Sequence, residues 1–120
     1  MSFELTAHAR GSLLVISLRG QLDAADAASA MTAVTDLPVR GRSVVIELAA
    51  LDFIDCFALN ALLEMRLAVR LAGGEVLLAA PHQRVQRLLA LTGMDRTFAV
   101  YRTVADAAAA AGAYARQAGA

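Results

Sequence analysis

The stretch SVVIELAALDFIDCFALNALLEMRLAVRL, residues 43–71, decides the fold class of this chain. Its first part, Ser43–Leu48, is a short and nearly continuous apolar run, which is typical of a central strand covered on both faces. Ala49–Phe53 is expected to be a connecting loop. Asp55 then precedes a helical pattern over Cys56–Leu71. Its leucines recur at helical spacing and predict one buried stripe: Leu59, Leu62, Leu63, Leu67 and Leu71.

The residues before this stretch predict a hairpin and a first helix. Phe3–Arg10 alternates apolar and polar side chains, as a half-buried edge strand does. Gly11-Ser12 is a turn signal before a second strand at Leu13–Leu18, and Gly20–Asp23 is expected to end the sheet. An alanine-rich helix is expected over Ala24–Leu37, with Asp23 as its N-cap and with Pro38 and Gly41 beyond its end.

The residues after the stretch continue the alternation of strand and helix. Gly73-Gly74 is expected to terminate the preceding helix, and Glu75–Ala79 is another short apolar strand. A helix is then expected to begin at Pro81, to face inward through Val85, Leu88 and Leu89, and to end at Gly93. After it we expect a strand at Phe98–Tyr101 and a helix over Val104–Gln117 with Thr103 as its cap. The end of the chain, 117–120, is expected to be frayed. The order β-β-α-β-α-β-α-β-α predicts a single α/β domain over residues 1–120, with a mostly parallel mixed sheet of about four to five strands and about four helices.

The composition excludes several classes of function. In 120 residues, 11 arginines balance 11 acidic side chains and lysine is absent, so neither a broad electrostatic grip on nucleic acid nor a P-loop is expected. One cysteine and two histidines, His8 and His82, suggest no disulfide framework, metal site or cofactor. Charged residues interrupt every apolar run before the ~18–20 residues that span a bilayer. A lone cysteine without an export signal indicates a cytoplasmic protein with no membrane insertion.

The segment between the central strand and its helix is the most informative for function, because loops at the carboxyl ends of parallel strands are where such sheets present their sites. Asp55 is expected as the N-cap, and Asp52 is either a solvated turn residue or a partner contact. Phe53 and Phe57 either join the core or form an exposed apolar tip. Cys56 is expected by default to be a small buried side chain. Because it stands at a helix start, the alternatives of a redox-sensitive thiol or a catalytic nucleophile stay open, although the neighbouring carboxylates oppose formation of a thiolate.

Several stretches, in their order and spacing, resemble a known family. Gly20–Asp23 is similar to the family's G-x-L-D at the start of its first helix, and Val44–Leu48 with Leu51–Asp55 to the strand and loop before its D-S-x-G-L motif. Leu71–Leu78 is similar to its helix-to-strand passage, and Leu88–Phe98 to its L-x-L-T-G-x-D-x-x-F segment. The chain thus resembles the STAS domains, in particular the bacterial anti-sigma factor antagonists, over nearly its whole length. That resemblance implies a protein–protein switch and not an enzyme.

The sequence departs from the family where the family carries its phosphoacceptor serine. Asp55-Cys56-Phe57-Ala58-Leu59 stands in place of D-S-x-G-L, so Cys56 occupies the phosphoacceptor position and serine phosphorylation does not carry over. The resemblance implies a protein that binds an anti-sigma factor of the serine-kinase type and so regulates sigma-factor-dependent transcription. The expected contact residues are Asp23, Asp52, Phe53, Asp55, Phe57, Ala58, Leu59 and Asn60.

Three alternatives and the oligomeric state stay open at this point. The same fold occurs, within the family, in subunits of ABC-type lipid transporters and in stressosome-like scaffolds, and Cys56 is compatible with a redox sensor. A homodimer through the Phe3–Leu18 edge or an apolar helix face is also open. A neighbouring gene for a kinase-type anti-sigma factor would favour the antagonist over the other classes.

Overall fold

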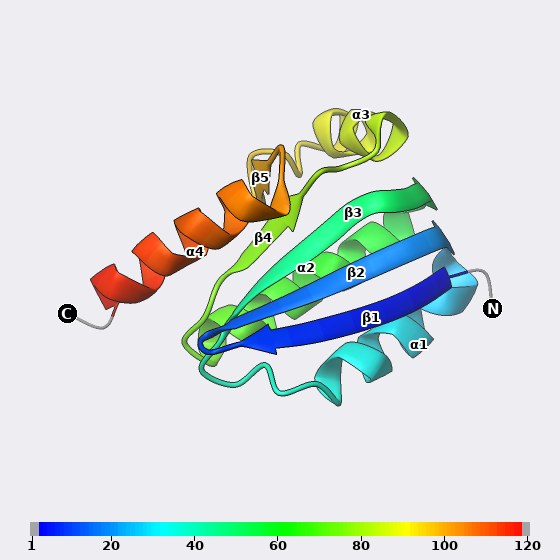
Figure 1. The fold of residues 1–120 in the computed structure, drawn as a ribbon. Helices are drawn as coiled ribbons and strands as arrows, with labels where there is room; N and C mark the ends of the chain where they lie inside the picture. The colour runs from blue at the N-terminus through cyan, green and yellow to red at the C-terminus, as the bar shows by residue number, and fades with distance from the viewer. Residues whose placement is uncertain (1–2, 119–120) are drawn as a thin grey trace.

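A five-stranded sheet with helices on both faces forms the protein in the computed structural model, which describes residues 3–118 (Figure 1). The elements are β1 (Phe3–Arg10), β2 (Leu13–Leu22), α1 (Ala24–Thr35), β3 (Ser43–Ile54), α2 (Cys56–Leu71), β4 (Val76–Ala79), α3 (Gln83–Thr92), β5 (Ala99–Tyr101) and α4 (Val104–Ala118). The strands lie in chain order, with β1 antiparallel to β2 and all other neighbours parallel. The predicted element order and mostly parallel mixed sheet are therefore confirmed.

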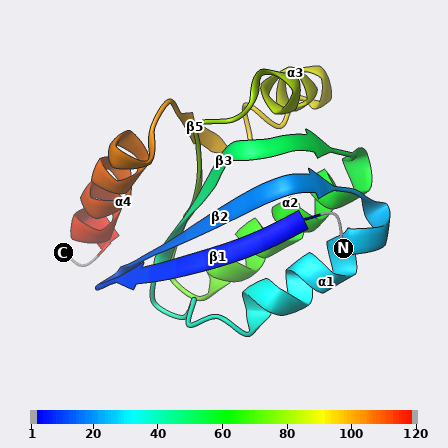
Figure 2. The same ribbon diagram turned by 45° about the vertical axis from the view of Figure 1, so that its right-hand side comes forward.

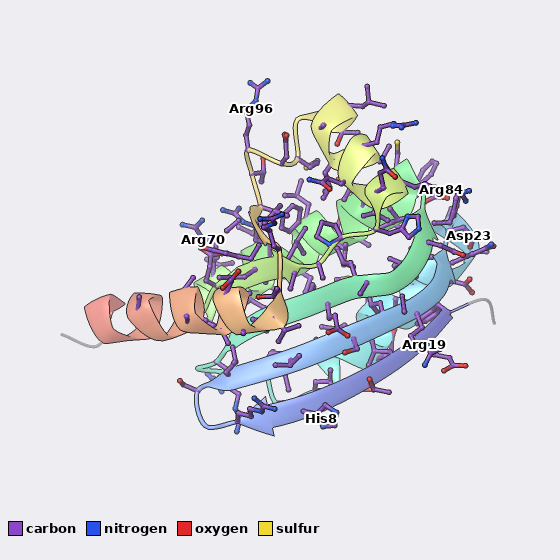
Figure 3. All side chains as sticks on the ribbon, turned by 45° about the horizontal axis from the view of Figure 1, so that its top comes forward. His8, Arg19, Asp23, Arg70, Arg84 and Arg96 are labelled. Atoms are coloured by element: carbon purple, nitrogen blue, oxygen red, sulfur yellow. The ribbon has the colours of Figure 1, made fainter. Side chains whose placement is uncertain are left out.

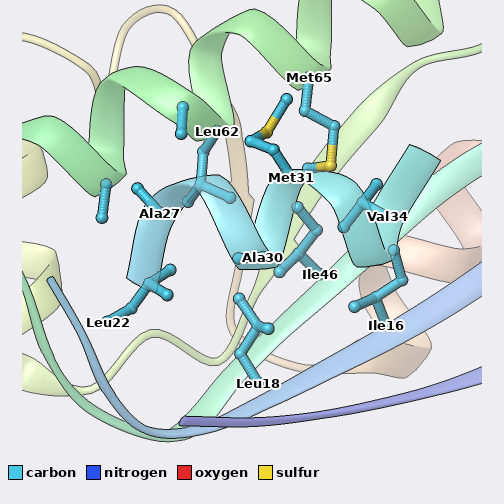
Figure 4. A pocket seen from close by; sticks show the side chains of 12 residues that line it. Ile16, Leu18, Leu22, Ala27, Ala30, Met31, Val34, Ile46, Leu62 and Met65 are labelled. Carbon is cyan, nitrogen blue, oxygen red and sulfur yellow. The ribbon is translucent and has the colours of Figure 1, made fainter. Parts of the chain in front are cut away.

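The two faces of the sheet carry two separate apolar clusters, because successive side chains of a strand point to opposite faces. The larger cluster packs between the sheet and α1, α2 and α3, and Figure 4 shows its centre, where Ile16 and Ile46 of the sheet meet Ala30 of α1 and Leu62 of α2. The smaller cluster lies under α4 and includes Val45 of β3. Figure 2 shows α4 on the opposite side of the sheet from α1 and α2. Burial on both faces confirms that Ser43–Leu48 is a central strand.

The second and third strands are longer than the sequence predicts. Gly20–Leu22 continues β2 instead of ending the sheet, and Ala49–Phe53 continues β3 instead of forming a loop. Two register shifts between these strands each leave one extra residue in β3. Bulges of this kind break the alternation of a strand. Every third residue is consequently buried at the end of β3: Leu48, Leu51 and Ile54.

The inner face of α2 also differs from the predicted stripe. Leu59 and Leu62 are buried as expected, but Leu67 and Leu71 are 60% and 82% exposed. Met65 and Val69 take their places in the core. The reason is geometric: each step of four residues turns a helix by about 400°, so a row of such steps drifts about 40° away from the core per step.

The helix ends follow the predicted capping chemistry with small shifts in position. Asp23 and Thr103 accept hydrogen bonds from the first turns of α1 and α4, as expected. The α3 helix begins at Gln83 and not at Pro81, because the Nδ1 of His82 accepts from the Arg84 N–H at 3.1 Å. Gly93 ends α3 in a left-handed conformation.

The remaining boundaries differ by one or two residues. The α1 helix ends at Thr35, two residues before the predicted Leu37, and β4 and β5 each begin one residue late. The expected frayed end at 117–120 is helical as far as Ala118, and its last two residues lie outside the described range. Within residues 3–118, no helix has the length and apolar content needed to cross a membrane.

The turn after α2 depends on two glycines with different tasks. Gly73 takes φ +94°, a left-handed conformation that costs glycine little, and its N–H donates to the Arg70 carbonyl. The Gly74 N–H donates to the Val69 carbonyl, which completes a Schellman motif. A Cβ on Gly74 would collide with the Arg42 backbone carbonyl. The expected role of Gly73-Gly74 as a helix terminator is thus confirmed, and close approach of the chain adds a second reason for Gly74.

Candidate protein-binding surface

Asp55 joins the first turns of α1 and α2 through a single carboxylate. Its Oδ1 accepts a hydrogen bond from the Ala58 N–H at 2.9 Å, which makes it the predicted N-cap of α2. Its Oδ2 accepts from the Ala24 N–H at 2.8 Å, at the first residue of α1. The Asp55 N–H also donates to the Leu22 carbonyl at the end of β2. The Asp55 side chain therefore fixes two helix starts while its backbone N–H holds the end of β2, and negative charge is favourable at both helix N-termini.

The start of α2 exposes both apolar and polar side chains to solvent. Phe57 is 75% exposed and Phe53, at the end of β3, is 46% exposed. Asp52, Cys56 and Asn60 are exposed as well. The structure therefore supports the exposed alternative for both aromatic rings and excludes the one in which they belong to the core. We refer to Cys56, Phe57 and Asn60 as the α2 tip.

Two of the expected contact residues are buried, and a third is half-buried. Ala58 and Leu59, expected as contacts, are 0% and 2% exposed, so their side chains belong to the core and not to the surface. They are buried because the capped helix turns them toward the sheet. Asp23 is half-buried, and its Oδ1 accepts from the Asp26 N–H as a cap. The default expectation of a buried Cys56 is wrong, since the thiol is free and exposed.

A surface groove of ≈ 390 Å³ between α1 and α2 adjoins the α2 tip. Small side chains, among them Ala27 and Ala61, line it together with Met31, Phe57 and Glu64. The sequence predicts secondary contacts from Asp23 and the first helix, but it singles out none of the groove residues on the α1 side of this surface. Its only signal was a pair of adjacent alanines at 27 and 28 on a helix that the sequence already placed beside the tip.

The described residues bring together no metal-binding cluster at this surface. Within residues 3–118, no three of the His, Cys, Asp and Glu side chains form a cluster suited to a metal ion. His8 on β1 lies far from Asp23 at the start of α1 (Figure 3), and His82 caps α3. What this surface can do is dock another surface through a rigid aromatic anchor.

Comparisons with known proteins agree on one family. A family model described as the STAS domain matches residues 4–107. A curated relative from Thermotoga neapolitana, assigned by name to the anti-sigma factor antagonists, is 31% identical over 66 residues, which are 55% of this chain and 58% of the relative. The chain thus spans 58% of the length of the curated relatives it matches.

Solved structures give the same answer over more of the chain. The crystal structure of an anti-sigma factor antagonist from Mycobacterium paratuberculosis has a TM-score of 0.72 at 28% identity, with 92% of this chain and 94% of that one covered. The phosphorylated form of SpoIIAA, a Bacillus cell fate determinant, has a TM-score of 0.65 at 18% identity and covers 88% and 95% of the two chains. At that identity the second likeness concerns the fold alone.

Proposed function

The chain belongs to the STAS domain family, and from this premise we propose that it acts as an anti-sigma factor antagonist, without enzymatic activity of its own. It binds an anti-sigma factor of the serine-kinase type and thereby releases a sigma factor for transcription. Relatives that bear the antagonist name at 31% and 28% identity support this proposal. The observation that carries it is Phe57, a large apolar side chain 75% exposed on a fixed first turn of α2.

Phe57 has the properties of an interface anchor. A contiguous apolar surface on a protein often marks a site of interaction, and Phe57 extends the apolar lining of the α1–α2 groove. Because Asp55 already holds the helix start, little ordering of the backbone is needed when a partner binds. Burial of an exposed phenylalanine contributes about 1.5–3 kcal/mol, which corresponds to a factor of about 10 to 150 in affinity.

Cys56 distinguishes this chain from antagonists that are switched off by phosphorylation. In the family the residue at this position is the serine that the partner kinase modifies, and the added phosphate brings about −1.5 to −2 charges to the interface. The Cys56 thiol does not offer the serine hydroxyl that forms this ester. The complex is therefore expected to persist in the presence of the kinase and ATP. Cys56→Ser is expected to restore phosphorylation and, with it, release.

Calorimetric titration against the kinase-type anti-sigma factors of the same genome tests the proposal. We expect one of them to bind, and Phe57→Ala to raise the dissociation constant by about tenfold or more. Leu71→Ala is the matched control, since Leu71 is a similarly exposed apolar residue at the other end of α2. Absence of binding to every candidate would overturn the proposal, as would equal losses in the two variants.

A further inference from the structure

A second surface groove is lined by Phe53, which the sequence predicts to be a contact residue. It has a volume of ≈ 260 Å³ and lies between the end of β3 and the helix α3. Phe53, Leu88 and Leu91 give it apolar walls, and Leu91 is 78% exposed. Arg84 and Arg87 complete the lining on the α3 side, with Asp52 on the β3 side. We call this the α3 groove; Phe53, which lines it, lies three residues before Cys56 of the α2 tip in the chain.

The charge of the α3 groove has one predominant sign. Arg84 and Arg87 are three residues apart on α3, so they share one face of the helix, and both are exposed. Within residues 3–118 neither arginine takes part in an ion pair, whereas Arg66 and Arg70 both pair with Glu75. The helix α3 contains no acidic residue, and the stretch 83–102 holds four arginines against one aspartate. Figure 3 shows one of these, Arg96, extending away from the sheet.

We propose that the α3 groove docks an acidic segment of the partner that carries a bulky apolar side chain. This inference rests on the proposed function, because it names the chemistry of the partner at the same surface. The guanidinium groups of Arg84 and Arg87 match carboxylates in geometry and charge. The apolar walls favour a polypeptide over a bare phosphate group, because they offer no hydrogen bond to a phosphate. A bound phosphate would also leave the Leu91 side chain exposed to water.

The first experiment uses the anti-sigma factor that binds the unmodified protein. The double variant Arg84→Glu/Arg87→Glu is expected to raise the dissociation constant about tenfold or more, and to flatten its dependence on salt. The matched control is Arg10→Glu/Arg40→Glu, which changes net charge equally at two exposed arginines outside both grooves. Equal effects of the two double variants would overturn this inference. If Phe57→Ala weakens binding and Arg84→Glu/Arg87→Glu does not, the inference fails while the proposed function stands.

The second experiment is independent of the anti-sigma factor. Two peptides of equal length, one built of Glu, Ala and Leu in helical spacing and the other with Lys in place of Glu, are titrated into ¹⁵N-labelled protein. The acidic peptide is expected to move the amide signals of Phe53, Leu88 and Leu91 in a saturable, salt-sensitive way, and the basic peptide to leave them in place. Equal responses to both peptides would overturn the inference. So would an equal response to inorganic phosphate or to phosphatidylglycerol vesicles.

Discussion

Replacing Asp55 by alanine removes a carboxylate that serves two helices at once. One oxygen accepts the Ala58 N–H at 2.9 Å and the other accepts the Ala24 N–H at 2.8 Å. Loss of an N-cap costs about 1 kcal/mol. A further hydrogen bond to a charged acceptor contributes about 1.5–3 kcal/mol, and the exposed position of the bond to Ala24 favours the lower end. We therefore expect Asp55→Ala to lower the free energy of unfolding by about 2–3 kcal/mol.

Asp23 supplies the matched control for this effect. Its carboxylate caps α1 alone, through one hydrogen bond of 3.2 Å to the Asp26 N–H, so Asp23→Ala is expected to cost about 1 kcal/mol. Urea unfolding followed by circular dichroism measures both variants, which should shift the midpoint at unchanged slope. Asp55→Asn keeps one acceptor oxygen and is expected to fall between them. Equal losses in Asp55→Ala and Asp23→Ala would refute the shared role of Asp55.

Two further predictions concern the turn after α2 and the exposed thiol. Gly41→Ala places a Cβ in open space at a left-handed residue and is expected to destabilise the protein by roughly 1 kcal/mol. Gly74→Ala is expected to destabilise it by more than that, because its Cβ would collide with backbone. Thermal unfolding of both variants measures the difference. Cys56 is expected to react fully with Ellman's reagent in the folded protein, because its thiol is exposed, and a bulky maleimide there should block binding of the anti-sigma factor. If the thiol reacts only after unfolding, Cys56 is not exposed. If the labelled protein binds the anti-sigma factor as well as the unlabelled protein does, Cys56 is not part of the interface.

The elements that the sequence predicts well are those with a local cause. The helix α2 spans Cys56–Leu71 in both the prediction and the structure, because an aspartate precedes it and two glycines follow it. The hairpin of β1 and β2 is likewise marked by a local turn at Gly11-Ser12. In each case the backbone groups at the element's end find their partners within a few residues, so the sequence alone contains the information.

The end of β3 shows why other parts were not predictable. The two bulges exist only in the pairing with β2, where Arg19 faces Ala50 and Gln21 faces Phe53. Without knowledge of that register, buried residues at every third position look like neither a strand nor an amphipathic helix. The same bulges determine which side chains leave the core, and so the exposure of Phe53 is a tertiary effect.

The orientation of the α2 tip, in contrast, follows from the sequence once two facts are combined. Asp55 is the N-cap, and a helix beside a sheet must turn one face of its first full turn inward. If Ala58 and Leu59 are the inward pair, a rotation of about 100° per residue places Phe57 and Asn60 about 60° apart on the opposite, outward face of the helix. The family resemblance alone treated all four residues as contacts, whereas helix geometry divides them into two that hold the helix on the sheet and two that can meet a partner. The α3 groove required more than this, because its walls come from a bulged strand and a helix that lie about thirty residues apart in the chain and meet only in the folded protein.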